Sequence, residues 1–211
     1  YNSNNDLGCL KNSKYKDNID LILGDVRDYD SVFKSMKGSD IVFHLAALIG
    51  IPYSYVSPLA YVKTNIEGTY NVLEAAKNLK IKNTIVTSTS EVYGSAKYLP
   101  MDEKHPLNAQ SPYAASKIAA DQLALSYHKS FNLPVKIIRP FNTYGPRQSS
   151  RAVIPRIITQ CLINKSKKIT LGNTKPTRDF NYVEDICNAY FFVLKSKKLT
   201  GQFVNVGSNT N

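Results

Sequence analysis

Two short polar segments, residues 87–94 and 111–117, constrain the fold of this chain more than any other feature of its sequence. The first reads Thr-Ser-Thr-Ser-Glu-Val-Tyr-Gly and follows a short apolar run, residues 84–86, of the kind found in buried parallel strands. The second reads Ser-Pro-Tyr-Ala-Ala-Ser-Lys, with a serine suited to cap a helix and a proline suited to its first turn. Ligands of open α/β sheets bind beyond the carboxyl ends of the strands, so the sequence predicts a ligand site where the two segments meet.

Tyr113 and Lys117 in the second segment stand four residues apart, so they share one face of the predicted helix. A free tyrosine has a pKa of about 10. To accept a proton from a hydroxyl near neutral pH, the phenol must lower that pKa by roughly three units, which corresponds to about 4 kcal/mol. A neighbouring ammonium is one means of lowering it. The same spacing also arises by chance on exposed helix faces, and on spacing alone both interpretations stay open.

Taken together, the two segments resemble the extended short-chain dehydrogenase/reductase family of nucleotide-sugar enzymes, also described as NAD-dependent epimerases and dehydratases. The resemblance continues through residues 44–47, 64–65, 139–147 and 177–180. The sequence of residues 48–55 and 148–155 is most similar to that of the N-acetylglucosamine-nucleotide 4,6-dehydratases of legionaminic-acid-type sugar synthesis. The implied fold is α/β: a Rossmann-like, doubly wound parallel sheet with a smaller C-terminal substrate lobe, incomplete at both ends.

The resemblance implies 4,6-dehydration of a UDP- or GDP-linked N-acetylglucosamine, with NAD as cofactor. Tyr113 would take the proton of the C4 hydroxyl, Thr89 would hydrogen-bond the same oxygen, and Glu91 would remove the C5 proton before water leaves from C6. Many dehydratases carry Asp-Glu where this chain has Ser90 and Glu91. This departure is similar to the GDP-mannose dehydratase branch, and it leaves open which group protonates the C6 oxygen.

Three alternatives remain beside the dehydratase. A nucleotide-uronic-acid decarboxylase or a 4-epimerase of the same family would use much of the same machinery, although an epimerase has no need of the Glu91 carboxylate. A non-catalytic binding module would agree with the net charge of +11. It would also agree with the absence of the glycine-rich loop by which the family binds its dinucleotide.

The resemblance also assigns roles to individual residues. Local sequence offers a second role for Asp25, as the cap of a helix over 29–36, and for Arg178, as half of a structural ion pair. His44, at a strand end, is expected to be a buried hydrogen-bonded residue, and no metal site is expected. The expected catalytic residues are Thr89, Glu91, Tyr113 and Lys117; the cofactor-binding residues are Asp25, Val26, Leu45, Ala46, Ala47, Asn65, Thr87, Tyr113, Lys117 and Phe141; the substrate-binding residues are Ser90, Asn142, Arg151 and Arg178.

The expected domains are an NAD-binding domain over residues 1–147 and a partial substrate lobe over 148–211, with strand exchange between them. No glycine-rich nucleotide loop follows a strand in this sequence. We therefore expect the chain to begin after that unit, to stop before the end of the substrate lobe, and to be unstable and inactive alone. By analogy with the family, a homodimer would form through helices over 58–79 and 112–131.

The composition narrows the possible partners. The net charge is +11, but the basic residues form short clusters without a long stripe or interleaved aromatics, so no nucleic-acid partner is expected. No apolar run is long enough to cross a bilayer, and the sequence starts with polar residues. Its three cysteines are far apart, which is typical of a reducing, cytoplasmic setting.

Hydrophobic patterning predicts the remaining elements. The expected strands cover residues 20–23, 40–45, 84–86, 135–139, 169–171, 178–182 and 203–207, and the expected helices cover 29–36, 58–79, 112–131, 152–163 and 183–194, with residues 142–151 as a loop.

Overall fold

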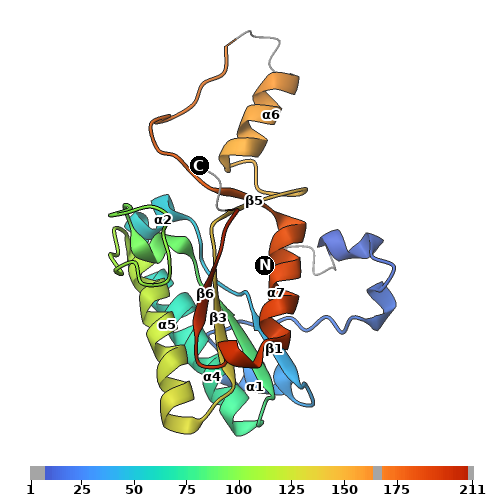
Figure 1. The fold of residues 1–211 in the computed structure, drawn as a ribbon. Helices are drawn as coiled ribbons and strands as arrows, with labels where there is room; N and C mark the ends of the chain where they lie inside the picture. The colour runs from blue at the N-terminus through green and yellow to red at the C-terminus, as the bar shows by residue number, and fades with distance from the viewer. Residues whose placement is uncertain (1–7, 164–167, 209–211) are drawn as a thin grey trace.

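A four-stranded parallel sheet forms the centre of the molecule (Figure 1). The computed structural model describes residues 8–163 and 168–208. The strands lie in the order β1-β2-β3-β6, and each neighbouring pair is parallel. This arrangement confirms the predicted Rossmann-like α/β fold. The bounds are β1 (Ile41–His44), β2 (Asn83–Thr87), β3 (Val135–Pro140) and β6 (Phe203–Val206).

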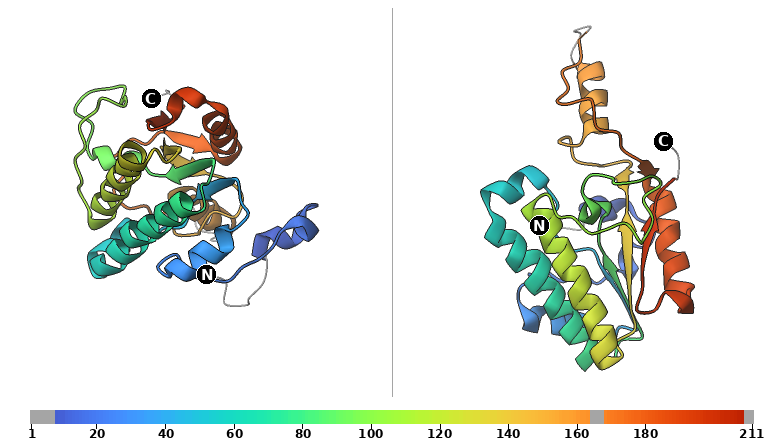
Figure 2. Two further views of the ribbon diagram at one scale, coloured as in Figure 1. Left: turned by 90° about the horizontal axis from the view of Figure 1, so that it is seen from below. Right: turned by 60° about the vertical axis from the view of Figure 1, so that its left-hand side comes forward.

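Helices cover both faces of this sheet (Figure 2). On one face lie α1 (Tyr29–Met36), α4 (Gly68–Asn78) and α5 (Pro112–Phe131), and on the other lies α7 (Val183–Lys195). The parallel strands are joined by crossovers that contain α4, α5 and α7, as parallel pairing requires, and α1 precedes β1. Helix α5 has the predicted bounds, and α1 and α7 lie within one residue of theirs.

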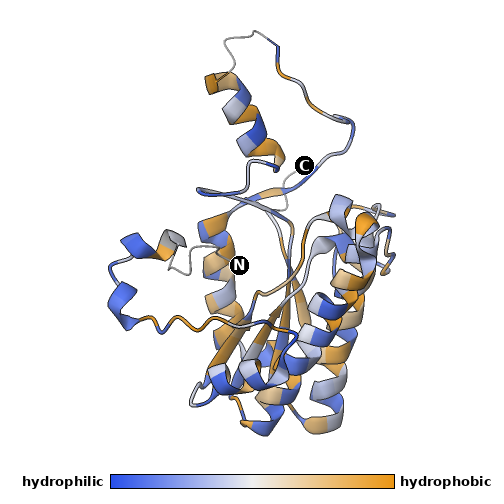
Figure 3. Ribbon diagram, turned by 180° about the vertical axis from the view of Figure 1, so that it is seen from behind, coloured by the Kyte–Doolittle hydropathy of each residue, from blue (hydrophilic) through white to orange (hydrophobic). Residues whose placement is uncertain are grey.

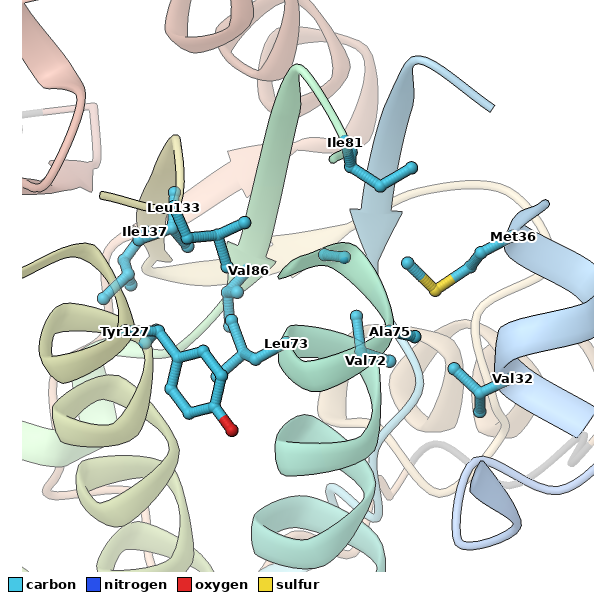
Figure 4. Close-up of a cluster of buried hydrophobic side chains, with 13 residues drawn as sticks. Val32, Met36, Val72, Leu73, Ala75, Ile81, Val86, Tyr127, Leu133 and Ile137 are labelled. Atoms are coloured by element: carbon cyan, nitrogen blue, oxygen red, sulfur yellow. The ribbon is translucent and has the colours of Figure 1, made fainter. Parts of the chain in front are cut away.

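Successive side chains of the central strands point to opposite faces of the sheet, so these strands contribute to a hydrophobic cluster on each face. Val86 and Ile137 point into the cluster beneath α4 and α5, while Ile85 and Ile138 point toward α7. Strands buried on both faces therefore read as continuous apolar runs, which is why the sequence revealed them. Figure 4 shows the larger cluster, with Leu73 of α4 fully buried at its centre.

A second, smaller assembly lies beyond the carboxyl end of the sheet (Figure 1). Strand β4 (Asn142–Tyr144) pairs in parallel with β5 (Phe180–Tyr182). Helix α6 (Val153–Ile163) lies between these two strands in the sequence and projects away from the main sheet. Strand β6 then returns to the main sheet beside β3. The boundary that we predicted at residue 147 stays a prediction.

Short helical segments complete the chain. They are η1 (Gly8–Asn12), η2 (Lys16–Asn18), α2 (Ile51–Val56), α3 (Pro58–Tyr61), the π-helical segment η3 (Val62–Glu67), η4 (Ser90–Tyr93) and η5 (Lys197–Leu199).

Several sequence-based expectations about these elements were wrong. Residues 20–23 and 169–171 are not strands, because neither segment has a bonded strand partner in the described part of the chain. The expected loop over 142–151 contains β4, and the single helix expected over 58–79 is divided into α3, η3 and α4, with the unexpected α2 before it. The cap of α1 is Asp28, whose carboxylate accepts from the backbone N–H groups of Asp30 and Ser31, so the alternative role for Asp25 was wrong.

Candidate functional site

The first turn of α5 places Tyr113 and Lys117 against the sheet. Ser111 caps the helix by accepting a hydrogen bond from the Ala114 N–H at 3.1 Å, as its sequence predicted. Tyr113 is 7% exposed and Lys117 is 4% exposed. Because both side chains are buried, the interpretation of the Tyr-x-x-x-Lys spacing as an exposed helix face was wrong.

Thr89 and Glu91 reach the same phenol from the end of β2. The Thr89 hydroxyl accepts a hydrogen bond from the Glu91 N–H at 3.2 Å, which starts the short helix η4. A side-chain hydrogen bond joins Thr89 to Tyr113, and the Glu91 carboxylate is close enough to Tyr113 to affect its pKa. The structure therefore places Thr89 against the Tyr113 phenol, and the Glu91 carboxylate near enough for its charge to act on that phenol.

Lys117 lies beside this cluster but contacts the backbone. Its Nζ donates to the carbonyl oxygen of Thr87, the last residue of β2, at 2.5 Å. Burial lowers the pKa of Lys117, and the neighbouring Asp121 carboxylate opposes that change. The ammonium is thus held at the strand end, one turn along α5 from the phenol.

The pKa of Tyr113 is raised to about 12 in this protein, first by burial and further by the charge of Glu91. The hydrogen bond with Thr89 acts in the opposite direction. Burial favours the neutral phenol over the phenolate. The protein alone therefore favours a proton donor at Tyr113, and a general base would require an additional positive charge close to the ring.

Asn65 joins the segment after β1 to α5. Its side chain accepts from the Leu48 N–H at 2.8 Å and donates to the Leu48 carbonyl at 2.9 Å and to the Ser116 hydroxyl at 2.9 Å. Asn65 lies within the π-helical segment η3, and such segments are frequent at functional sites. This residue accordingly fixes the chain beside Ala46 and Ala47 relative to Tyr113.

A pocket of about 240 Å³ lies between residues 22–26 and the end of β1. Four predicted cofactor residues line it: Asp25, Val26, Leu45 and Ala46. The carboxylate of Asp25 is bound by the Arg27 guanidinium, which lowers the pKa of Asp25 to about 2. Ala47 follows directly in the sequence and is partly buried.

Val26 is fixed by contacts with α4. Asn71 donates to its carbonyl oxygen at 3.0 Å. A Cβ added at Gly68 would lie 2.6 Å from a Val26 methyl, so glycine is required there for the close approach.

Other predicted site residues have side-chain or backbone partners outside the Tyr113 cluster, or line a second pocket. The Thr87 hydroxyl is hydrogen-bonded to Tyr190 of α7 at 2.6 Å, on the opposite face of the sheet from α5. Ser90 is partly buried in η4, while Phe141 donates its backbone N–H to the Val206 carbonyl. Asn142 lines a second pocket of about 180 Å³ that also includes Gln148 and Phe180.

The two predicted substrate arginines are exposed on the smaller assembly. Arg178 donates to the neighbouring Thr177 carbonyl at 2.8 Å, and the backbone N–H of Arg151 donates to the Ser149 hydroxyl at 3.3 Å. The carboxylate of Asp179 accepts from Ser208 and Asn181. The structure does not bring either arginine to the Tyr113 cluster.

His44 is buried, as expected, and its Nε2 is hydrogen-bonded to the Thr69 hydroxyl at 3.0 Å. Burial and the nearby charge of Lys117 lower the pKa of His44 to about 3. A neutral imidazole therefore packs between β1 and α4.

Sequence reasoning missed a buried charged pair next to Lys117. Asp121, one turn further along α5, accepts from Nε and Nη2 of Arg139 at 3.0 and 2.8 Å, and both side chains are at most 1% exposed. The signal was present, since Arg139 interrupts an apolar strand and Asp121 interrupts an alanine-rich helix face. Ser88 also donates to the same Asp121 oxygen at 2.9 Å.

The described residues contain neither a metal-binding cluster nor a membrane-spanning helix. Within residues 8–163 and 168–208, no group of three or more His, Cys, Asp or Glu side chains is arranged to hold a metal ion. No helix in this part of the chain is long and apolar enough to cross a membrane.

A parallel sheet with helices on both faces, and with a buried tyrosine and lysine from one helix at its carboxyl edge, defines a Rossmann-like protein of the epimerase/dehydratase class. The chain belongs to the GDP-mannose 4,6 dehydratase family, whose model matches residues 2–211. The family predicted from the sequence motifs is therefore confirmed.

Curated relatives agree with this placement. The chain is 39% identical to the dTDP-D-glucose 4,6-dehydratase of Dictyostelium discoideum over 97% of its own length and 49% of the relative. It is 35% identical to the human enzyme of the same name, over 95% and 57%. The chain thus spans about half the length of the curated relatives it matches.

Solved structures give the same fold. A dTDP-glucose 4,6-dehydratase double mutant from Streptomyces venezuelae, solved with NAD bound, superposes with a TM-score of 0.86 at 29% identity, over 95% of this chain and 61% of that one. A UDP-N-acetylglucosamine 4-epimerase from Methanobrevibacter ruminantium superposes with a TM-score of 0.85 at 36% identity, over 93% and 63%. The structural neighbours therefore include both dehydratases and epimerases.

Proposed function

We propose that this chain is part of an NAD-dependent nucleotide-sugar 4,6-dehydratase that acts on UDP- or GDP-linked N-acetylglucosamine. The observation that carries the proposal is that the turn after β2 sets Thr89 against the buried phenol of Tyr113 and holds the Glu91 charge near it. The curated relatives named above are dTDP-glucose dehydratases, so dTDP-glucose is the main competing substrate.

The residues of this chain fit a dinucleotide at two points. The pocket lined by Asp25, Val26 and Ala46 would take the adenosine end, and Lys117, Phe141 and the segment held by Asn65 would surround the nicotinamide end. Bound NAD would accept a hydride from C4 of the sugar and later return it to C6. The positive charge of an oxidised nicotinamide, together with the ammonium of Lys117, would oppose the effect of burial on the pKa of Tyr113.

Three side chains of this chain would then move or hold the protons. Tyr113 would accept the proton of the C4 hydroxyl as general base, while Thr89 would hydrogen-bond the same oxygen and so orient it. The resulting 4-ketone acidifies the C5 proton, and the Glu91 carboxylate would remove it as the C6 hydroxyl leaves with a proton as water. C5 would regain a proton when hydride is returned to C6, which completes the 4-keto-6-deoxy product. Ser90, Asn142, Arg151 and Arg178 would contact the substrate, the arginines through its diphosphate.

A 4-epimerase is the second candidate, because epimerases occur among the structural neighbours at 36% and 33% identity. Epimerisation needs hydride and proton transfer at C4 alone, so it would not use a base at C5. A decarboxylase of a nucleotide uronic acid would need neither loss of the C6 hydroxyl nor the return of hydride to C6. The role of Glu91 therefore separates the candidates.

The test is a product assay on the complete gene product with NAD and, in separate reactions, UDP-N-acetylglucosamine, GDP-N-acetylglucosamine, dTDP-glucose and UDP-glucuronate. A 4-keto-6-deoxy product from either N-acetylglucosamine nucleotide supports the proposal. The same product from dTDP-glucose alone would retain the reaction and correct the substrate. An inverted C4 centre or released carbon dioxide would replace the dehydratase with an epimerase or a decarboxylase.

Glu91→Gln sharpens this assay. The variant keeps the size and hydrogen-bonding capacity of the side chain but removes the carboxylate base. We expect it to reduce NAD transiently on mixing with substrate and to lose water at least about 100-fold more slowly. Normal dehydration by Glu91→Gln would show that another group is the base.

The protein's surroundings are part of the same proposal. We propose a cytoplasmic homodimer that pairs through α5 and the helical stretch over 58–79, without a nucleic-acid or membrane partner. Support comes from the short, scattered clusters of basic residues and from the exposed apolar side chains of Leu59, Val62 and Tyr70. Light scattering and a salt-dependent gel shift with DNA and RNA test these points.

A further inference from the structure

A chain of polar side chains runs beneath the Tyr113 cluster. It starts at the ion pair of Asp121 with Arg139 and continues through the hydroxyl of Tyr93 to Asn205. Arg139 donates from Nη1 to the Tyr93 hydroxyl at 2.8 Å, and that hydroxyl donates to Oδ1 of Asn205 at 2.8 Å. Tyr93 itself is fully buried.

Each member of this chain comes from a different element of the site. Asp121 lies four residues after Lys117 on α5, and Arg139 lies in β3. Tyr93 ends the short helix η4, two residues after Glu91, and Asn205 lies in β6. The Tyr93 hydroxyl therefore connects the turn that carries Glu91 with two strands of the sheet and, through Arg139, with the helix that carries Tyr113.

The geometry around Tyr93 is restrictive. The Arg139 guanidinium lies 5.1 Å from the centre of the Tyr93 ring and 3.8 Å from that of Phe203, so it is held between two aromatic faces. The Tyr93 ring also meets the His105 ring edge-on at 5.4 Å. A buried polar network of this kind favours one arrangement, because each further group that lost its partner would be costly. Only Oδ2 of Asp121 is bonded in it, to Arg139 and Ser88, while the buried Oδ1 has no partner among the described residues.

The short helix η4 depends on such support. It contains only Ser90–Tyr93, and the adjacent Gly94 has a φ of 65°, so its own backbone hydrogen bonds hold it weakly. A change of about 1 Å in the position of a catalytic group can lower a rate by about 100-fold. The position of Glu91 therefore requires an anchor, and the Tyr93 hydroxyl links this turn to β3 and β6 through Arg139 and Asn205.

We propose that Tyr93 is a positioning residue, whose hydroxyl, held by Arg139 and Asn205, sets the place of the turn carrying Thr89 and Glu91 relative to Tyr113. The inference rests on the proposed function for its kinetic consequence. A tyrosine that only filled the core would serve equally well as phenylalanine.

The experiment compares Tyr93→Phe with Tyr127→Phe in the complete gene product with NAD. Tyr127 is a matched control, because it is also buried and its hydroxyl also donates to a side chain, Glu74, at 2.8 Å, but at the far end of α5. We expect Tyr93→Phe to lower kcat about tenfold or more with KM changed less than about twofold, and to raise the fraction of reduced cofactor during turnover. Tyr127→Phe should leave all three unchanged.

Amide hydrogen exchange of residues 89–94 supplies a second measurement that does not depend on the reaction. Faster exchange in Tyr93→Phe, but not in Tyr127→Phe, supports the positioning role. Equal kinetics and equal exchange in the two variants would overturn it. If the wild-type protein proves to be an epimerase or to be inactive, the proposed function fails, and the exchange result alone decides for or against the positioning role.

A gentler variant guards against loss of folding. Asn205→Ser shortens the acceptor of the Tyr93 hydroxyl while leaving the buried ion pair and both rings in place. It should lower kcat and increase exchange of residues 89–94 in the same direction as Tyr93→Phe, but less. No change in either quantity would count against the proposal.

Discussion

The two ends of the proposed substrate site are built very differently. At the junction of α5 and β2, Tyr113, Lys117 and Thr89 are all less than one-tenth exposed, and the buried pair of Asp121 and Arg139 supports them. In the smaller assembly, Arg178 is exposed and α6 contains no buried residue. The groups proposed to move protons are thus fixed by the core, whereas those proposed to bind the diphosphate are not.

Packing, rather than hydropathy alone, accounts for the difference (Figure 3). The central strands are apolar and pack on both faces, so the turns at their carboxyl ends are held by the sheet. Helix α6 is also rich in apolar residues, yet Leu162 is 79% exposed and Ile163 is 72% exposed. The comparison predicts that changes near α5 alter chemistry and folding together, whereas changes in the smaller assembly alter substrate binding alone.

The largest expected effect is on chemistry at the buried end. Tyr113→Phe removes the proposed general base and should lower kcat by about 100-fold to 10,000-fold, with loss of cofactor reduction as well as of product. Tyr15→Phe, at an exposed position outside the sheet and its helices, is the control and should have wild-type kinetics. Cofactor reduction at the wild-type rate in Tyr113→Phe would contradict the assignment.

A pair of leucine substitutions tests the difference in stability. Leu73→Ala empties a fully buried position in α4 and should lower the free energy of unfolding by about 2–5 kcal/mol. Leu162→Ala in α6 should change it by less than about 0.5 kcal/mol. Denaturant titrations of both variants measure this difference. Similar losses would mean that α6 is packed against a further part of the protein in solution.

The third prediction concerns pH. Because burial lowers the pKa of His44 to about 3, below its unfolded value of about 6.5, the folded state excludes a proton that the unfolded state binds. The stability that His44 contributes is therefore present above pH 6.5 and is lost as the pH falls toward 3. The expected slope is about 1.4 kcal/mol per pH unit within that range.

Substitution isolates this slope. In His44→Asn the proton-binding group is removed, and the carboxylates with lowered pKa values, Asp25 and Glu74, remain in both proteins and cancel in the difference. The stability difference between wild type and variant should therefore shrink as the pH falls from 6.5. A difference that is independent of pH would show that His44 becomes charged in the folded state.

The sequence predicted α5 and the central strands correctly, and its wrongly predicted strands lie outside this packed region. Helix α5 is marked in the sequence by a capping serine and a proline in its first turn, and the central strands are marked by continuous apolar runs. Residues 20–23 and 169–171 were wrongly predicted to be strands. Their composition suits a strand, but a strand forms only where a partner strand lies beside it. That partner is not encoded locally.

The buried network was hidden for a related reason. Lys117 and Asp121 share a helix face that the sequence displays, but Arg139 meets Asp121 only after β3 has packed beneath α5. The interruption of the helix at η3 likewise depends on Asn65, whose hydrogen bonds to Leu48 and Ser116 join distant segments. The roles of the predicted residues remain predictions, although the fold itself brings Thr89, Glu91 and Lys117 close to Tyr113.

The smallest expected effect lies in the exposed assembly and concerns Arg178. Within residues 8–163 and 168–208, its guanidinium hydrogen-bonds only to the neighbouring Thr177 carbonyl, so the exposed side chain can turn toward a diphosphate. Arg178→Gln should raise KM for the nucleotide sugar about tenfold, with kcat and unfolding free energy nearly unchanged, because an interaction made equally in the bound substrate and the transition state is lost.

Arg178→Lys keeps the charge but loses the paired donors, and it should give an intermediate KM. Steady-state kinetics at two salt concentrations measure both variants. A fall in kcat without a change in KM would mean that Arg178 reaches the reacting centre, and the two ends of the site would then act as one.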